Sequence, residues 1–108
     1  MFSENLTNTL KSTKSIAVLT GAGVSAESGV PTFRGKQGLW KSYKPEAIAN
    51  FDAFIRNPKL VWEWYNFRKD LIRNVAPNPG HDALVKIERH YLEFTLITQN
   101  VDNLQRKA

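Results

Sequence analysis

The 108-residue sequence has no cysteine, so neither a disulfide framework nor a thiolate metal site can form within it. It also has no apolar run close to the roughly 20 residues that span a bilayer. The N-terminus begins Met-Phe-Ser-Glu, which lacks the basic start and apolar core of a secretory signal, and the early acid argues against a transit peptide. From these absences we expect a cytoplasmic protein with no membrane partner.

Positive charge is in modest excess, and the basic residues are not clustered. Lys and Arg number 15 against 10 acids, which gives a net charge of +5. This excess is compatible with a phosphate, an acidic substrate or nucleic acid, and it selects none of them. Because the basic residues are scattered along the chain, their distribution disfavours a nucleic-acid partner. The hydrophobic content of 42% is that of an ordinary globular domain, and the length suits one domain.

Two short apolar runs, residues 16–20 and 94–98, are typical of strands buried on both faces, as in parallel sheets. Between them, Asn57-Pro58 is typical of a helix start, because proline fits the first helical position. Apolar side chains then recur at helical spacing until the proline-rich turn of residues 76–80. Further helices are predicted over residues 3–13 and 81–90.

This order of elements predicts an α/β fold with a helical insertion between two parallel strands. Two strands do not make a stable sheet, since both faces and an edge stay open. We therefore expect the opening part of a larger Rossmann-like domain. A simple dehydrogenase is disfavoured, because its second strand follows about 20 residues after the glycine loop, whereas here the next strand begins at Phe94.

A glycine-rich segment follows the first predicted strand. Gly21-x-Gly23, with Ala26 in third place, matches the start of a dinucleotide-binding fingerprint. Glycine lets the backbone turn sharply and approach a pyrophosphate, and a helix starting near Val24 would direct free N–H groups to the same spot. A plain strand-to-helix turn that happens to be rich in glycine remains the alternative. No Gly-Lys-Ser/Thr follows, so a phosphate loop of the nucleotide triphosphatase type is excluded.

Two longer motifs carry a family resemblance. Residues 21–35 (GAGVSAESGVPTFRG) and 98–104 (TQNVDNL) resemble the two signatures of the sirtuins, in the same order and spacing. The resemblance runs from about Ile16 to the C-terminus. It implies that residues 1–108 are the N-terminal portion of a sirtuin catalytic domain, without the zinc module and the C-terminal half of the Rossmann sheet.

The resemblance also implies a reaction. Sirtuins are NAD-dependent protein lysine deacylases that transfer the acyl group of a modified lysine to ADP-ribose and release nicotinamide. The implied cofactor is NAD, the implied partners are acylated lysine side chains of proteins, and zinc is expected only in the part of the domain outside this sequence. The alternative is an inactive remnant or regulatory module that binds NAD or ADP-ribose. The oligomeric state stays open.

Individual residues carry over from the family onto this sequence. The first motif implies a cofactor-binding loop of Gly21, Ala22, Gly23, Glu27, Thr32, Phe33, Arg34 and Trp40. The second implies further cofactor contacts by Gln99, Asn100, Val101 and Asp102. Asn100 would assist catalysis, whereas the general-base histidine of the family would lie beyond Ala108. Without the family, Phe33 is a packed loop aromatic, and Asn100 and Asp102 are polar residues at a strand end that cap a helix.

Tyr65 and Arg68 give a hint about the acyl group. They are three positions apart on a predicted helix and therefore share one face. A guanidinium beside a phenol makes a receptor for a carboxylate. The pair resembles the Tyr-x-x-Arg motif of the sirtuin branch that removes succinyl, malonyl or glutaryl groups. A surface arginine and a half-buried tyrosine are the alternative. The sequence departs from the family at Gln105, where a histidine is usual.

Overall fold

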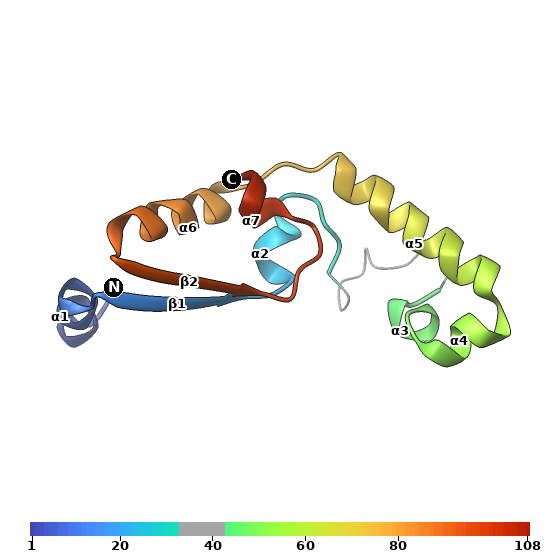
Figure 1. Cartoon of the computed structure of the whole chain (residues 1–108), viewed down its shortest axis with the longest axis horizontal. Helices are drawn as coiled ribbons and strands as arrows, with labels where there is room; N and C mark the ends of the chain where they lie inside the picture. Colours follow the sequence, from blue (N-terminus) through green and yellow to red (C-terminus); the bar gives the residue numbers. More distant parts are fainter. Residues whose placement is uncertain (33–42) are drawn as a thin grey trace.

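The computed structural model describes residues 1–32 and 43–108, which form an elongated molecule of 54 × 24 × 24 Å (Figure 1). A two-stranded sheet with its helices lies at one end, and a helical lobe lies at the other. In chain order the elements are α1 (Glu4–Ser12), β1 (Ser15–Thr20), α2 (Gly23–Ala26), α3 (Pro45–Ile48), α4 (Phe51–Arg56), α5 (Pro58–Arg73), α6 (Pro79–His90), β2 (Glu93–Thr98) and α7 (Leu104–Lys107).

The two strands pair in parallel, with Ser15 opposite Glu93 and Thr20 opposite Thr98. The α/β fold with a helical insertion is therefore confirmed. Both strands end at the same edge, so the turns that follow them lie side by side (Figure 1). The sheet topology thus brings the two sequence motifs together, although they are far apart in the chain.

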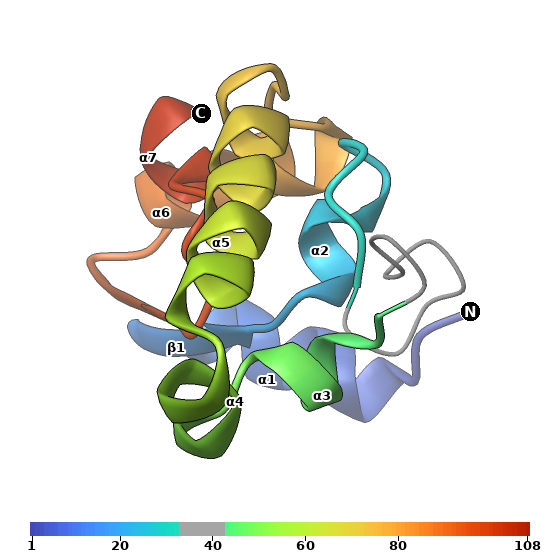
Figure 2. The same ribbon diagram turned by 90° about the vertical axis from the view of Figure 1, so that its right-hand side faces the viewer.

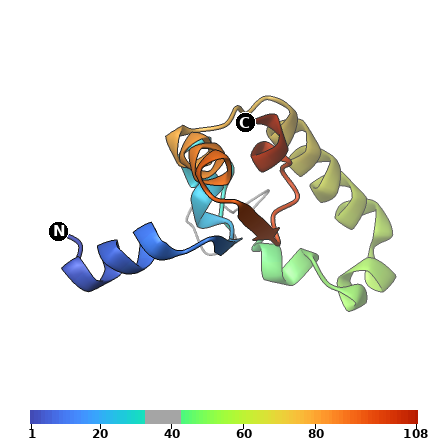
Figure 3. The same cartoon turned by 60° about the vertical axis from the view of Figure 1, so that its left-hand side comes forward.

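Burial alternates along both strands, so one face of the sheet is covered and the other is open. Helix α6 lies along the covered face, as Figure 3 also shows. On the open face Leu19 and Ile97 are 75% and 53% exposed. The prediction that the strands are buried on both faces is therefore wrong for the described residues. The helices among those residues cover only one face of the sheet.

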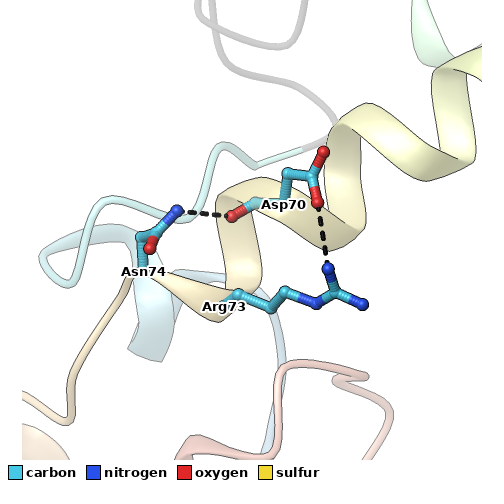
Figure 4. Close-up of polar contacts among 3 residues, drawn as sticks. All are labelled: Asp70, Arg73 and Asn74. Atoms are coloured by element: carbon cyan, nitrogen blue, oxygen red, sulfur yellow. Dashed lines mark hydrogen bonds and ion pairs between the residues drawn. The ribbon is translucent and has the colours of Figure 1, made fainter.

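The helical lobe is built on α5. Asn57 caps its N-terminus by accepting a hydrogen bond from the Leu60 N–H, and Pro58 occupies the first turn, as predicted. At its C-terminus the Asn74 side chain donates to the Asp70 carbonyl, and Arg73 pairs with the Asp70 carboxylate at 3.3 Å (Figure 4). Asn74 is the C-cap residue of the helix.

A small core holds the lobe together. Trp64 is 1% exposed and packs with Val61 of the same helix and Ile48 of α3. Helices α3 and α4 were not predicted, because elements of four and six residues are too short to show a helical repeat in the sequence. Asn50 joins them, since its side chain donates to the Glu46 carbonyl and accepts from the Ala53 N–H.

Among the residues that the structure describes, no helix is long and apolar enough to cross a membrane. Within the same residues there is no group of three or more His, Asp or Glu side chains suited to a metal ion.

Candidate functional site

A cavity of about 920 Å³ lies between the carboxyl ends of the strands and α5, the helix that faces the viewer in Figure 2. This volume falls within the range of about 300–1,000 Å³ that is usual for cofactor and small-molecule sites. Its walls come from three segments: the loop around α2, helix α5 and the turn after β2. The lining residues are Ala22, Val30, Pro31, Trp64, Tyr65, Arg68, Lys69, Ile72, Arg73, Gln99, Asn100, Val101 and Asp102.

The turns after the two strands are joined by the side chain of Asn100. Its Nδ2 donates to the Gly21 carbonyl at 2.8 Å and lies 3.5 Å from the hydroxyl of the fully buried Ser25. Its own backbone N–H donates to the Thr98 hydroxyl at 3.1 Å. Asn100 therefore has a defined position at the edge of the cavity, with the glycine loop directly opposite.

The glycine loop folds into the single helical turn α2, which is followed by a tight C-terminal turn. Gly29 has φ +93°, and the N–H groups of Gly29 and Val30 donate to the carbonyls of Ala26 and Ser25. This pattern is the Schellman motif that closes many helices, and its left-handed residue favours glycine. After this turn the chain returns to the cavity wall at Val30.

The two first glycines of the loop differ in what surrounds them. A Cβ at Gly21 would lie 3.3 Å from Nε2 of Gln99, so the close approach of the two turns favours glycine there. A Cβ at Gly23 would have no atom within 4 Å. The backbone at Gly23 is thus open to solvent, and a ligand can approach it without displacing protein atoms.

Asp102 has a structural contact in addition to its place in the cavity wall. It is 3% exposed, and its carboxylate accepts a hydrogen bond from the Leu104 N–H at 3.0 Å. This hydrogen bond holds the turn that leads into α7, whose N-cap residue is Asn103. Asn103, with φ 61°, takes the left-handed conformation that turns the chain into α7.

Gln105 connects α7 to both strands. Its Nε2 lies 3.2 Å from the Thr20 hydroxyl and 3.4 Å from the Thr98 hydroxyl. These two threonines are partners at the end of the ladder. The departure from the family at Gln105 therefore supplies a cross-link between the strand ends.

Tyr65 and Arg68 both line the cavity from α5, as their spacing predicts. Arg68 lies over the ring of the buried Trp64, with its guanidinium carbon 5.2 Å from the ring centroid. Tyr65 meets the same ring edge-on at 4.8 Å. Burial lowers the pKa of Arg68, and the neighbouring Tyr65 raises it. The guanidinium still carries its charge at neutral pH, because an arginine side chain keeps its proton far above pH 7.

The structure brings together some of the predicted site residues and not others. Ala22, Tyr65 and Arg68 line the cavity together with the whole segment 99–102. Four other predicted residues do not line it: Gly21, Gly23, Glu27 and Thr32. Gly21 still contacts Asn100, whereas Glu27 is exposed at the end of α2 and Thr32 is half-buried beyond it. The predicted cofactor contacts of Phe33, Arg34 and Trp40 lie outside the described residues.

Sequence reasoning missed several wall residues. Trp64 lies four positions before Arg68, a spacing that places an aromatic ring beneath a cation on one helix face. Lys69 and Arg73 add further positive charge to the same wall. Asn78, which contacts the glycine loop from α6, gave no signal in the sequence beyond its place before a proline.

Comparisons with known proteins agree with this geometry. The sequence model described as the Sir2 family matches residues 21–108. The chain belongs to the Sir2 family. It is 59% identical over 93 residues to the NAD-dependent protein deacylase of Aquifex aeolicus, and the match covers 86% of this chain and 39% of that protein. It is 50% identical over 105 residues to the NAD-dependent protein deacylase 1 of Archaeoglobus fulgidus, covering 97% of this chain and 43% of that protein.

Solved Sir2 structures share the fold. A Sir2 homologue in complex with NAD superposes with a TM-score of 0.86 at 48% identity, over 99% of this chain and 42% of that one. A Sir2 homologue variant in complex with 2′-O-acetyl ADP ribose gives a TM-score of 0.90 at 49% identity, over 98% of this chain and 43% of that one. The chain therefore spans less than half the length of the Sir2 relatives that it matches.

The cavity fits a dinucleotide in size and in chemistry. It combines the turn at Ala22, an amide pair at Gln99 and Asn100, and apolar surface from Val30 and Ile72. Polar groups that converge in a largely apolar hollow are typical of cofactor sites.

Proposed function

We propose that residues 1–108 form the NAD-binding N-terminal portion of an NAD-dependent protein lysine deacylase. One observation carries the proposal: the turns after β1 and β2 meet through Asn100 and Gly21 at the edge of a cavity large enough for a dinucleotide. The match to relatives described as NAD-dependent protein deacylases supports the same activity.

In this proposal NAD lies across the cavity. Ala22 and the open backbone of Gly23 would face the pyrophosphate, because no Cβ at Gly23 keeps the phosphates away from the chain. Gln99 and Asn100 would bind the ribose next to the nicotinamide. The bound cofactor supplies a C1′ carbon from which nicotinamide leaves and to which the acyl oxygen of the modified lysine can add.

Asn100 and Asp102 suit their proposed tasks because other contacts hold them in place. The Asn100 amide donates to the Gly21 carbonyl, which leaves its side-chain oxygen as an acceptor for a ribose hydroxyl. The Asp102 carboxylate accepts from the Leu104 N–H and has a second oxygen for the amide of nicotinamide. A side chain oriented by a neighbour loses less conformational freedom when the ligand binds.

The substrate group that we propose is an acyl chain with a terminal carboxylate, such as succinyl, malonyl or glutaryl. Arg68 presents a charged guanidinium to the cavity, and Tyr65 adds a hydroxyl donor beside it. A partly buried cation binds a carboxylate more strongly than an exposed one, because the local dielectric constant is lower. Lys69 and Arg73 make the same wall more attractive to an anion.

Neither histidine of the chain suits the role of general base. His81 is fully buried, and its Nδ1 accepts a hydrogen bond from the Asn78 N–H. His90 is exposed at the C-terminal end of α6, and neither side chain lines the cavity. A general base is typically worth about 10²–10⁴-fold in rate. We therefore expect no measurable turnover from residues 1–108 alone, and the base would come from another segment of the complete deacylase.

A chimera tests the proposed activity. In it the matched 93 residues replace the corresponding segment of the Aquifex aeolicus deacylase. We expect NAD-dependent release of nicotinamide with acyl-lysine peptides, and Asn100→Ala in the chimera serves as the inactive control. A chimera that folds and binds NAD but releases no nicotinamide would favour the inactive binding module instead.

A further inference from the structure

Asn78 lies outside the cavity but contacts the loop that forms one of its walls. Its Nδ2 donates to the Val24 carbonyl at 2.8 Å and to the Ser28 hydroxyl at 3.0 Å. Its Oδ1 accepts from the Gly80 N–H at 2.8 Å, and its backbone N–H donates to Nδ1 of His81 at 3.1 Å. Every polar group of the side chain is therefore used, and the residue is only 9% exposed.

The contact joins segments that are far apart in the chain. Val24 and Asn78 are separated by 54 residues, and Figure 3 shows α2 beside the N-terminal end of α6. Helix α2 is only four residues long and has no side-chain cap of its own. A single turn of helix has little stability without tertiary contacts, so its position depends on what holds it.

Two asparagines contact α2 and the residues beside it. Asn100 donates to the Gly21 carbonyl before the helix, and Asn78 donates to the Val24 carbonyl within it and to the Ser28 hydroxyl after it. Within the described parts of the chain, these are the asparagine contacts that tie the loop to β2 and to α6. Asn100 belongs to the proposed cofactor site, whereas Asn78 does not line the cavity.

Gly80 leaves room for the Asn78 side chain. A Cβ at Gly80 would lie 3.0 Å from Oδ1 of Asn78, which is a tight contact, and 3.7 Å from a methyl group of Val24, which is an ordinary van der Waals contact. A side chain at this position would therefore press on the Asn78 amide. Glycine at residue 80 thus lets the amide keep its place beside α2.

We propose that Asn78 is a positioning residue for the glycine loop: it holds α2 in the position that places Ala22 in the cavity wall. The inference rests on the proposed NAD site. Asn78 acts through α2 and would not touch the cofactor. A weaker hold would leave the loop in several positions, and NAD would have to select the competent one at a cost in affinity.

Two substitutions separate this role from the capping of α6. Asn78→Ser keeps a neutral N-cap, but its short side chain cannot reach Val24. Asn78→Asp keeps the acceptor for the Gly80 N–H and adds a charge that suits a helix N-terminus, but it has no N–H for the Val24 carbonyl. Asn50→Ser is the matched control, because Asn50 also donates to a carbonyl and caps a helix, with both partners inside the helical lobe.

Hydrogen exchange of the 108-residue chain tests the hold on α2. The amides of Ser28, Gly29 and Val30 close the loop and report on its opening. We expect both Asn78 variants to raise their exchange rates about tenfold, with little change in β1 and none from Asn50→Ser. Unchanged exchange in the loop would overturn the proposal. An equal rise throughout β1 and α6 would also overturn it, because Asn78 would then serve only the overall fold.

Added NAD distinguishes this inference from the proposed function. In the wild-type chain, millimolar NAD should slow exchange in the loop, and both Asn78 variants should need about tenfold more NAD for the same effect. Equal NAD requirements in variant and wild type would overturn the positioning role. Faster exchange in the variants, with no NAD effect even in the wild type, would overturn the NAD site and leave the hold of Asn78 on α2 supported.

Discussion

Replacement of Arg68 by methionine is the sharpest test of the proposed acyl pocket. Arg68 lines the cavity and stacks over Trp64. Methionine keeps a long, flexible side chain whose sulfur can also contact the Trp64 ring, so the helix and its core should survive the change. What the variant loses is the charge and the pair of parallel N–H donors that a carboxylate would accept.

The size of the effect follows from those two hydrogen bonds. A hydrogen bond to a charged group contributes about 1.5–3 kcal/mol. Because the cavity is open at its mouth and solvent screens part of the interaction, we take about 3 kcal/mol for the pair. That energy corresponds to a loss of about 100-fold in kcat/KM for a succinyl-lysine peptide. An acetyl-lysine peptide has no terminal carboxylate, and its kcat/KM should change less than about 3-fold.

The assay measures nicotinamide release by the Aquifex aeolicus chimera with the two peptides. Arg73→Met is the matched control, since Arg73 also lines the cavity but is largely exposed and paired with Asp70. We expect the control to lose less than about 3-fold with either peptide, as is usual for exposed charges. An equal loss of activity toward the succinyl-lysine and acetyl-lysine peptides in Arg68→Met would refute the carboxylate pocket. The residue would then support the site without distinguishing between acyl groups.

Three further predictions concern the fold that carries the site. Trp64→Ala should lower the free energy of unfolding by about 3–5 kcal/mol and melt the lobe of α3 to α5, and urea denaturation followed by circular dichroism checks it; a change under 1 kcal/mol would contradict the assigned core. Gln105→Ala should cost about 1 kcal/mol in the same measurement, because the strand-end threonines lose a donor, and an unchanged midpoint would exclude a cross-link. The open sheet face should make the 108-residue chain self-associate, and Ile97→Lys should reduce this in analytical ultracentrifugation; a wild-type chain that stays monomeric at high concentration would count against the idea.

The elements with strong local patterns were predictable from the sequence. The runs at residues 16–20 and 94–98 became the two strands, and Asn57-Pro58 began the long helix as expected. The meeting of the two motifs was also predictable, because parallel strands with a single crossover end at the same edge of the sheet.

Other features depend on contacts that no local pattern encodes. The open face of the sheet is a property of which helices are present, so the apolar runs alone could not reveal it. The place of Lys69 and Arg73 in the cavity wall follows from how α5 is rotated toward the cavity. The bond between Asn78 and Val24 depends on the approach of two segments 54 residues apart.

The central claim is that the turns after the two strands form one dinucleotide site, and amide chemical shifts measured during a titration with ADP-ribose test it most directly. The account predicts that shifts of the 108-residue chain concentrate at Ala22, Gly23 and residues 99–102, the two turns joined by Asn100. Saturating ADP-ribose that leaves both turns unchanged, or that shifts only α1 or the helical lobe, would contradict it.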